Sequence, residues 1–193
     1  LKKIDKIKKK INLKIIKKKY AAVYLGRLKH SKGIFDLPII WKKVLKNQPN
    51  SKLILIGEGS SKDKIKLKNL INKEKLEKLI IIKGFLSYEK VFKIFYQSRV
   101  FILPSREEGF GMAILEALSC NLKVVLWNMK VFTSVYKDLV LKSRCFDLND
   151  FSKKIIKSLK TKKNLNRVKK INKIKTKYSL ETQINKIDNF IYK

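Results

Sequence analysis

The chain of 193 residues is poor in the residues that mark irregular or turn-rich folds, with seven glycines and three prolines. Together with a hydrophobic fraction of 45%, this scarcity argues against a disordered chain and against an all-β architecture. A single histidine and two cysteines, Cys120 and Cys145, without a CxxC pair argue against a zinc site and favour a reduced, cytoplasmic setting. No apolar run approaches about 18 residues, so the sequence predicts no transmembrane helix.

Acidic residues are also scarce, because 15 Asp and Glu face 48 Lys and Arg and leave a formal net charge of +33. Lysine is abundant together with isoleucine and asparagine, as in an AT-biased coding sequence, and we favour this compositional origin of the charge. Attraction to an anionic membrane surface, at the inner face of the membrane, is a compatible hypothesis. The lysines are spread along the whole chain and form no recognised nucleic-acid module, so no specific nucleic-acid partner is predicted.

The most informative segment is LPSREEGFGMAILEAL, at 103–118. An apolar run that ends at Leu103, a loop with two glycines and a helix-forming run from Met112 are typical of a strand, a loop and a helix. Glycine lets the backbone approach a ligand closely, and the free N–H groups at a helix start attract phosphate. The carboxylates of Glu108 and Glu116 each have two acceptor oxygens, which suit a vicinal diol. Together these groups indicate a nucleotide-sugar site; the alternative is an acidic helix start that complements the helix dipole.

A second loop carries two cations five positions apart, Arg27 and Lys32, directly after the apolar run 21–25. Both side chains bind phosphate oxygens, and fixed cations stabilise the charge that a diphosphate leaving group gains. In a chain with 48 basic residues, an isolated pair of this kind is usually a solvated surface pair. Its position after a strand, about eighty residues before the glutamates, favours a functional role. Asp36 is expected to be the N-cap of the next helix, with Pro38 in the first turn.

Apolar runs alternate with amphipathic stretches from residue 20 to about residue 147. Further strands are expected at 52–56, 79–83, 100–103 and 123–126. The alternation predicts parallel strands with helical crossovers, an α/β doubly wound sheet, whose ligands lie at the carboxyl ends of the strands. Both Arg27 and Glu108 follow strands, as that rule requires. An apolar stripe at 91–96 has helical spacing and is interpreted as core.

The Pro-Ser-x-x-Glu-Gly-Phe-Gly segment from Pro104, with a second Glu eight positions after the first, resembles the donor-binding motif of the retaining GT-B glycosyltransferases, in particular glycosyltransferase family 4 (group 1). The loop around Arg27 is similar to that family's diphosphate loop. The resemblance implies a Rossmann-like sheet with flanking helices, the C-terminal half of a GT-B fold. It covers residues 20–193, a nucleotide-sugar donor-binding domain including C-terminal helices, whereas 1–19 is interpreted as a basic linker or remnant segment. The piece from residue 178 to 192 looks like the family's terminal helix, and the C-terminal end is expected to be natural.

The resemblance also implies a role for each motif residue. Glu108 would bind donor-sugar hydroxyls beside the reaction centre, and Arg27 and Lys32 would hold the diphosphate; these three are the expected catalytic residues. Glu116 would hold the ribose diol. The other expected donor contacts are Gly26, Gly57, Phe85 (facing the base), Phe110, Gly111 and Met112 (facing the sugar), and the N–H groups near Ile114 and Leu115 (assisting the diphosphate). The donor is a nucleoside-diphosphate sugar, and neither a metal nor another cofactor is expected.

The sequence departs from the family around 121–130. Asn121 and Lys123 stand where Gly and Pro are usual, and Trp127-Asn128-Met129-Lys130 replaces a glycine-rich turn. Nothing in the chain corresponds to the N-terminal domain with which family members bind an acceptor glycan or lipid-linked sugar. The first residue is Leu, and the chain is expected to be a fragment. We therefore expect donor binding but little or no transfer by this chain alone.

Three other classes of function stay open. A nucleotide-sugar epimerase shares the two-domain architecture but needs acid and base residues that the sequence does not offer. A non-catalytic subunit would bind the donor for a separately encoded acceptor-binding chain. A basic nucleic-acid-binding protein ranks last, because its affinity would depend on salt and not on Glu108 or Glu116. The sequence names neither the base, the sugar nor the acceptor.

Overall fold

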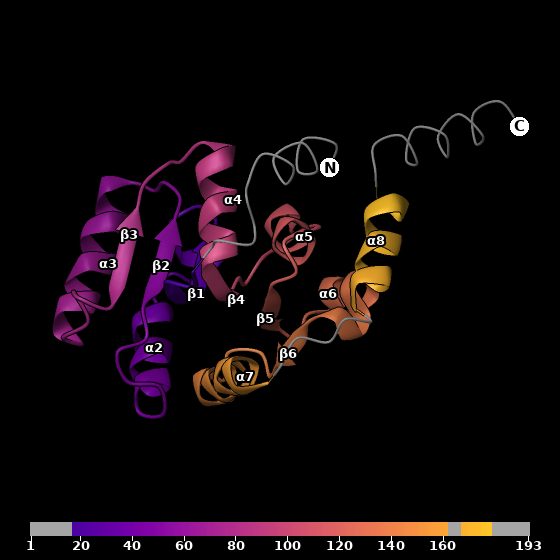
Figure 1. Ribbon diagram of the computed structural model, residues 1–193. Coiled ribbons are helices and arrows are strands. Elements are labelled where there is room, and N and C mark those ends of the chain that lie inside the picture. The colour runs from indigo at the N-terminus through magenta and orange to yellow at the C-terminus, as the bar shows by residue number, and fades with distance from the viewer. Residues whose placement is uncertain (1–16, 162–166, 179–193) are drawn as a thin grey trace, which may run out of the picture.

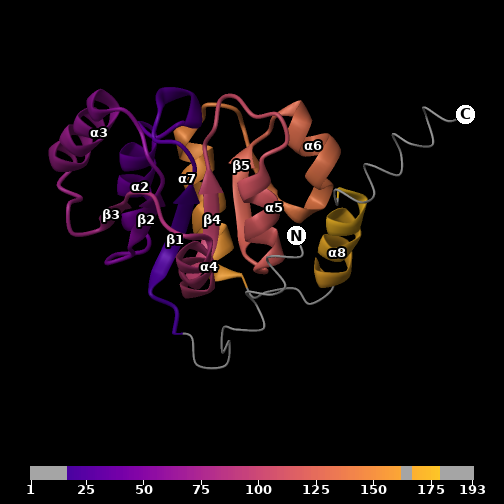
Figure 2. The same cartoon turned by 90° about the horizontal axis from the view of Figure 1, so that it is seen from above.

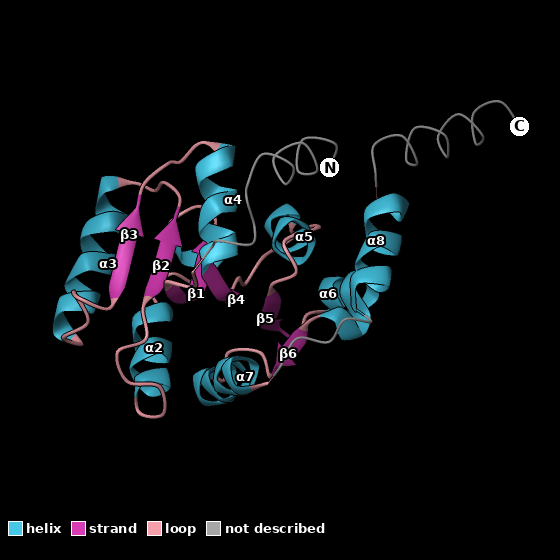
Figure 3. Ribbon diagram, in the orientation of Figure 1, coloured by secondary structure: helices cyan, strands magenta, loops and turns pink. Residues whose placement is uncertain are grey.

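Six parallel strands form one sheet in the computed structural model, which describes residues 17–161 and 167–178 (Figure 3). The strands are β1 (Tyr20–Leu25), β2 (Leu53–Ile56), β3 (Ile80–Lys83), β4 (Ser98–Leu103), β5 (Lys123–Trp127) and β6 (Leu141–Ser143). Their order across the sheet is β3-β2-β1-β4-β5-β6. This arrangement confirms the predicted doubly wound, Rossmann-like fold class.

The strand order reverses at β1, which pairs with β2 on one side and with β4 on the other. In the register of these pairs, Val23 lies beside Ile54 of β2 and beside Phe101 of β4. The chain builds β1, β2 and β3 in one direction and then crosses back to begin β4 next to β1. In open α/β sheets, the carboxyl edge at such a reversal is where ligands bind.

Helices cover both faces of the sheet (Figures 1 and 2). One face carries α2 (Leu37–Leu45) and α7 (Leu148–Lys160), which contact each other, and the opposite face carries α4 (Tyr88–Gln97) and α5 (Met112–Ser119). The remaining helices lie toward the edges and are α3 (Ser61–Lys73), α6 (Lys130–Tyr136) and α8 (Arg167–Lys177), with short 3-10 turns η2 (His30–Lys32) and η3 (Lys137–Leu139). No helix within the described residues is long and apolar enough to cross a membrane.

The core follows from strands that are buried on both faces. All four residues of β2 and all five of β5 are buried, as the continuous apolar runs of parallel strands require. On α4, Phe92 and Phe95 are fully buried, and Phe95 meets Phe101 of β4 edge to face at 5.8 Å. The apolar stripe at 91–96 is therefore core, as predicted, although Tyr96 is only partly buried.

Some details differ from the expectations. Asp36 is the N-cap of α2 and Pro38 lies in the first turn, but the Asp36 side chain makes no capping hydrogen bond. Strand β6 was not predicted, because its three residues, Leu-Lys-Ser, carry no apolar pattern. Most of the predicted segment 1–19 and nearly all of the predicted terminal helix lie outside the described residues, so the division at residue 20 stays a prediction.

Two glycines let the loops after β1, β2 and β4 pack backbone against backbone. Gly33, after β1, has a φ of 71°, and a Cβ there would lie 1.9 Å from the carbonyl oxygen of Pro104, after β4. Gly57, after β2, has a φ of 141°, and a Cβ there would lie 2.0 Å from the carbonyl oxygen of Gly26. Any other residue would meet both the clash and the unfavourable φ. These contacts fix three loops at the carboxyl edge of the sheet.

Replacing Gly33 with alanine should lower the free energy of unfolding by about 2 kcal/mol or more, because the added Cβ meets the Pro104 carbonyl at a positive φ. For a chain of this size, the Tm should fall by about 4 °C or more in a thermal unfolding experiment. Gly109→Ala is the matched control, because a Cβ at Gly109 meets no atom within 4 Å. Equal melting temperatures for the two variants would contradict the described packing.

Candidate functional site

The loops after β1 and β4 are joined by hydrogen bonds where the strand order reverses. The N–H of Arg106 donates to the carbonyl oxygen of Ser31 at 2.8 Å. The hydroxyl of Ser105 is shared between the carbonyl oxygens of Glu107, at 2.9 Å, and Ser31, at 3.3 Å. These hydrogen bonds hold the two predicted motif loops side by side, so that their charged side chains lie close together.

An ion pair between these two loops joins two of the predicted catalytic residues. The ammonium of Lys32 lies 2.6 Å from Oε1 of Glu108 and also donates to the carbonyl oxygen of Glu107 at 2.8 Å. Both side chains are largely shielded, with exposed fractions of 16% for Lys32 and 14% for Glu108. Because water is mostly excluded, the attraction between the two charges is screened less than in a surface ion pair. Each of these two charges is neutralised by the other.

The third predicted catalytic residue, Arg27, is exposed and makes no ion pair with another described residue. The Arg27 backbone is held in place, because the hydroxyl of the buried Tyr24 donates to the Arg27 carbonyl oxygen at 2.7 Å. Burial and the nearby charge of Glu108 raise the pKa of Tyr24, which keeps the hydroxyl protonated and donating. The loop is thus fixed while the guanidinium stays accessible to an anion.

A further ion pair, not predicted from the sequence, ties the loop after β4 to the start of α2. Nη2 of Arg106 lies 2.6 Å from Oδ2 of Asp36, and the guanidinium carbon lies 4.9 Å from the centre of the Phe146 ring. Asp36 therefore binds Arg106 in place of capping its own helix. Among 48 basic residues, nothing in the sequence distinguishes Arg106 as the one that makes this contact.

The glycine-aromatic turn of the main motif is held by Tyr136 of α6. The Tyr136 hydroxyl donates to the carbonyl oxygens of Phe110, at 2.9 Å, and Gly111, at 3.1 Å. The Phe110 ring packs between the rings of Tyr136, at 5.9 Å, and Tyr178, at 4.8 Å. Burial raises the pKa of Tyr136, so its hydroxyl is a permanent donor to this turn. No sequence pattern indicated that Tyr136 contacts the motif turn.

The start of α5 differs in detail from the expected anion site. The helix begins at Met112, and the N–H of Ile114 donates to the carbonyl oxygen of Gly111 at 2.9 Å. The side chain of Leu115 is buried in the core and that of Met112 is 57% exposed. In a helix, the first N–H groups have no preceding carbonyl to bind, and here those are the N–H groups of Met112 and Ala113.

The second motif glutamate, Glu116, lies in a pocket of about 210 Å³ at the carboxyl ends of β1 and β2. The pocket is lined by Leu25, Ile56, Gly57, Phe85, Leu86, Tyr88, Val91 and Glu116. Glu116 is only 7% exposed, and its Oε1 accepts a hydrogen bond of 2.5 Å from the Tyr88 hydroxyl. Burial raises the pKa of the Glu116 carboxyl, and the Tyr88 hydrogen bond opposes this effect. The pocket thus combines apolar walls with one deeply placed carboxylate.

The loop at the mouth of this pocket is set by Glu58. The N–H of Phe85 donates to Oε1 of Glu58 at 3.0 Å, and the ammonium of Lys64 lies 3.1 Å from Oε2. The backbone N–H of Phe85 is therefore already engaged, while the Phe85 ring is 82% exposed. Both hydrogen bonds lower the pKa of Glu58, the one from Lys64 foremost.

Lys123, which stands where the family usually has Pro, has a structural role away from the motif loops. Lys123 begins β5 at the amino edge of the sheet, away from the motif loops, and is 8% exposed. Its ammonium donates to the carbonyl oxygen of Ser158 at 2.6 Å and to the Thr161 hydroxyl at 2.9 Å. The side chain therefore satisfies the free carbonyls at the end of α7.

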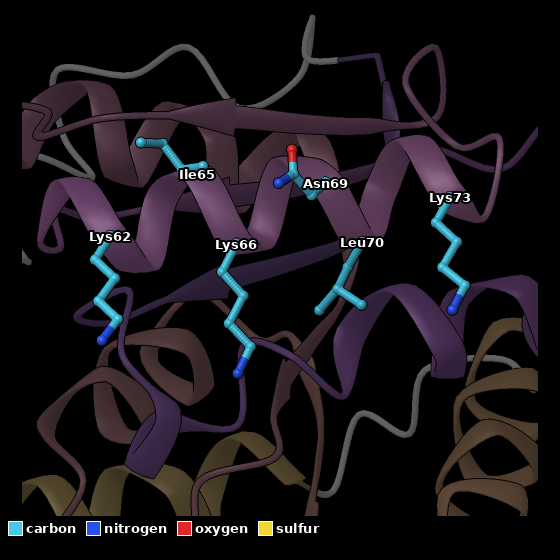
Figure 4. A pocket seen from close by; sticks show the side chains of 6 residues that line it. All are labelled: Lys62, Ile65, Lys66, Asn69, Leu70 and Lys73. Atoms are coloured by element: carbon cyan, nitrogen blue, oxygen red, sulfur yellow. The ribbon is translucent and has the colours of Figure 1, made fainter.

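A larger, open hollow of about 640 Å³ lies on the outer side of α3 (Figure 4). Figure 4 shows the side chains of Lys62, Lys66 and Lys73 extending from one side of the helix. The hollow offers no carboxylate and no backbone turn, so it lacks the chemistry of the motif loops. Within the part of the chain that the structure describes, no group of three or more His, Cys, Asp or Glu residues is placed to hold a metal ion.

The family model of the glycosyl transferases group 1 matches residues 5–175, and the chain belongs to this family. Curated relatives include an uncharacterized glycosyltransferase of Methanocaldococcus jannaschii, 35% identical over 116 residues, which are 60% of this chain and 28% of that protein. Another is the alpha-monoglucosyldiacylglycerol synthase of Acholeplasma laidlawii, 31% identical over 62% of this chain and 29% of that protein. The matched regions span less than a third of these relatives.

Several solved structures share this fold. One is a mutant of S. aureus TarM in complex with fondaparinux, alpha-GlcNAc-glycerol and UDP, with a TM-score of 0.78 and 24% identity. The match covers 90% of this chain and 36% of that one. At this identity, the likeness concerns the fold, and it agrees with the order and direction of the strands described above.

The buried carboxylate should make the protein less stable at neutral pH than it would be with an uncharged side chain. An unfolded Glu titrates near pH 4.3, and burial raises the pKa of Glu116 in the folded state, so its ionisation destabilises the fold as the pH rises through the folded pKa. Glu116→Gln should therefore raise the Tm at pH 7, with a smaller difference at pH 4. Thermal unfolding at the two pH values measures this.

The exposed Glu107 provides the control, because Glu107→Gln removes the same charge from the surface of the neighbouring loop. A Glu116→Gln variant that melts below the wild type at pH 7 while Glu107→Gln does not would show that the folded state favours the ionised form of Glu116.

Proposed function

We propose that this chain is the donor-binding part of a retaining glycosyltransferase of family 4 and that it holds a nucleoside-diphosphate sugar. The observation that carries the proposal is the contact of Lys32 with Glu108, at 2.6 Å. The two residues come from loops after different strands and meet where the strand order reverses, beside the pocket of Glu116. A cation, an accessible arginine and two carboxylates at this edge match the chemistry of a diphosphate between two polyols.

Arg27 and Lys32 hold the diphosphate. As the glycosidic bond breaks, the nucleoside diphosphate leaves with increased negative charge, and these fixed cations stabilise it more strongly than they stabilise the intact donor. The N–H groups of Met112 and Ala113 at the start of α5 add partial positive charge on the same side. The proposal requires no metal ion, because the chain itself supplies the positive charge at the leaving group.

The nucleoside occupies the pocket around Glu116. Its ribose diol donates to the carboxylate, and its base lies against the apolar walls toward Leu86 and Phe85 at the mouth. The exposed Phe85 ring is placed to cover the base, while the Phe85 N–H stays with Glu58. Because the walls are apolar and the loop amide is engaged, this pocket favours ribose strongly and discriminates weakly among bases.

Glu108 faces the sugar once the diphosphate competes for Lys32. A carboxylate released from its ion pair accepts hydrogen bonds from sugar hydroxyls and lies beside the reacting carbon. The turn at Phe110 and Gly111, fixed by Tyr136, brings backbone groups to the same sugar. Retention of configuration is part of the proposal and rests on the motif's resemblance to the retaining enzymes.

The acceptor is proposed to be a glycan or a lipid-linked sugar, bound by a part of the protein beyond this chain. The matched regions cover less than a third of the curated relatives, and the Acholeplasma relative is a synthase of a glucosyl diacylglycerol. The isolated chain should therefore bind the donor with little or no transfer. A lipid acceptor and the net charge of +33 are both consistent with binding at an anionic membrane surface.

Thermal shift with uridine, guanosine and adenosine diphosphates and their sugars tests donor binding directly. A ligand at a hundred times its Kd stabilises the fold by about 2.7 kcal/mol, which gives a clear rise in Tm. We expect these ligands to raise the Tm more than tripolyphosphate does in metal-free buffer, with the rise lost in Glu116→Ala and reduced in Arg27→Ala and Lys32→Ala.

Lys46→Ala is the control for charge alone, because it removes one exposed cation at the far end of α2. Tripolyphosphate and single-stranded DNA are the ligand controls. Equal rises in Tm with every polyanion, or equal losses of that rise in Lys46→Ala and Lys32→Ala, would mean that binding depends on net charge alone. Either result would refute the donor site.

Membrane attraction is tested by sedimentation with lipid vesicles. Vesicles with phosphatidylglycerol should bind the chain at 0.1 M salt and release most of it at 0.5 M, because the Debye length shortens with ionic strength. Vesicles of phosphatidylcholine alone should bind little. Equal binding to both kinds of vesicle, or binding that ignores salt, would contradict an electrostatic membrane surface.

A further inference from the structure

The Tyr88 hydroxyl occupies the position on Glu116 that a ligand hydroxyl needs. Tyr88 is the first residue of α4, and its hydroxyl lies 2.5 Å from Oε1 of the Glu116 carboxylate on α5. Its ring stacks on Phe92, with ring centres 5.7 Å apart and an angle of 26° between the planes. The side chain is still 46% exposed, so it lies at the open side of the pocket and not in the core.

The buried carboxylate of Glu116 requires a hydrogen-bond donor. It is 7% exposed, and no ion pair joins it to another residue of 17–161 or 167–178. A buried carboxylate is unfavourable unless hydrogen-bond donors or a charge of opposite sign reach it. Tyr88 reaches one of the two oxygens from a neighbouring helix, which leaves the acceptor capacity of the carboxylate only partly used.

We propose that Tyr88 is a latch that the ribose of the donor displaces from Glu116. The inference rests on the proposed function, since it concerns the nucleoside pocket of that site. A vicinal diol offers two donors to the carboxylate where Tyr88 offers one, so a ribose replaces the latch with a gain of one hydrogen bond. A ligand without these hydroxyls leaves the latch closed. Tyr88 thereby satisfies the carboxylate until a ligand with a diol replaces its hydroxyl.

The pocket walls allow this exchange without disturbing the fold. Tyr88 lies at the end of its helix beside the loop that carries Phe85, which is 82% exposed. Its neighbours Val91 and Phe92 are buried and anchor α4, so the ring can turn about its own side-chain bonds while the helix stays in place. Removing the hydroxyl therefore removes the competitor and leaves the pocket lining intact.

The test is the affinity of Tyr88→Phe, measured by calorimetry on the 193-residue chain with uridine, guanosine and adenosine diphosphates. Whichever diphosphate binds the wild type should bind Tyr88→Phe about three- to tenfold more tightly, because the ligand no longer has to break a hydrogen bond to a carboxylate. Its 2′,3′-dideoxy counterpart should bind both proteins equally. Tyr20→Phe, at the opposite end of β1, should leave both affinities unchanged.

Unchanged or weaker binding of the ribose ligand by Tyr88→Phe would overturn the latch while leaving the donor site standing. An equal gain for the dideoxy ligand would also overturn it, because the effect would not pass through the ribose. If the wild type binds none of the three diphosphates, the proposed function fails and the latch falls with it. Tyr88→Leu, which also lacks the hydroxyl, gives a second measurement of the same effect should the Phe variant be unstable.

Discussion

Backbone contact between loops is the constraint on which the site depends. The loops after β1, β2 and β4 approach each other so closely at Gly33 and Gly57 that a Cβ would lie about 2 Å from a neighbouring carbonyl oxygen. This approach brings the chain after β1 within reach of the chain after β4, and the Lys32 and Glu108 side chains then meet at 2.6 Å. The parallel sheet brings the ends of these strands to one edge. The glycines allow the loops that follow the strands to lie in direct contact.

Each of the two motif carboxylates has a partner among the described residues. Glu108 is held by the ammonium of Lys32, and the more deeply buried Glu116 is held by the hydroxyl of Tyr88. Lys32 and Tyr88 each lie on a different element from the carboxylate that they contact. Under the proposed function, a diphosphate competes for Lys32 and a diol competes with Tyr88 for Glu116. On that proposal, a donor that carries both groups displaces both partners, whereas a simple anion or a simple alcohol displaces only one.

The predictable part of the structure is the part that leaves a local pattern. Strands such as β2 are continuous apolar runs because both faces are buried, and the motif loops combine glycines with charges in a fixed order. The supporting contacts leave no such pattern, because they join distant positions. Arg106 and Asp36 are 70 residues apart and Tyr88 and Glu116 are 28 apart. Asp36 was expected to cap its helix, and only the packed structure shows that Arg106 takes its carboxylate.

The most direct test of the donor site is a residue-resolved map of ligand binding. Amide spectra of the isotopically labelled chain, titrated with the nucleoside-diphosphate sugar that stabilises it, report each backbone position separately. The account predicts that the largest shifts fall on 26–33, 57–59, 84–88 and 108–116, the loops at the carboxyl edge where the strand order reverses. Shifts spread over the lysine-rich helices, or centred on the hollow of α3, would contradict it and would leave the chain with the fold of the family but without its donor site.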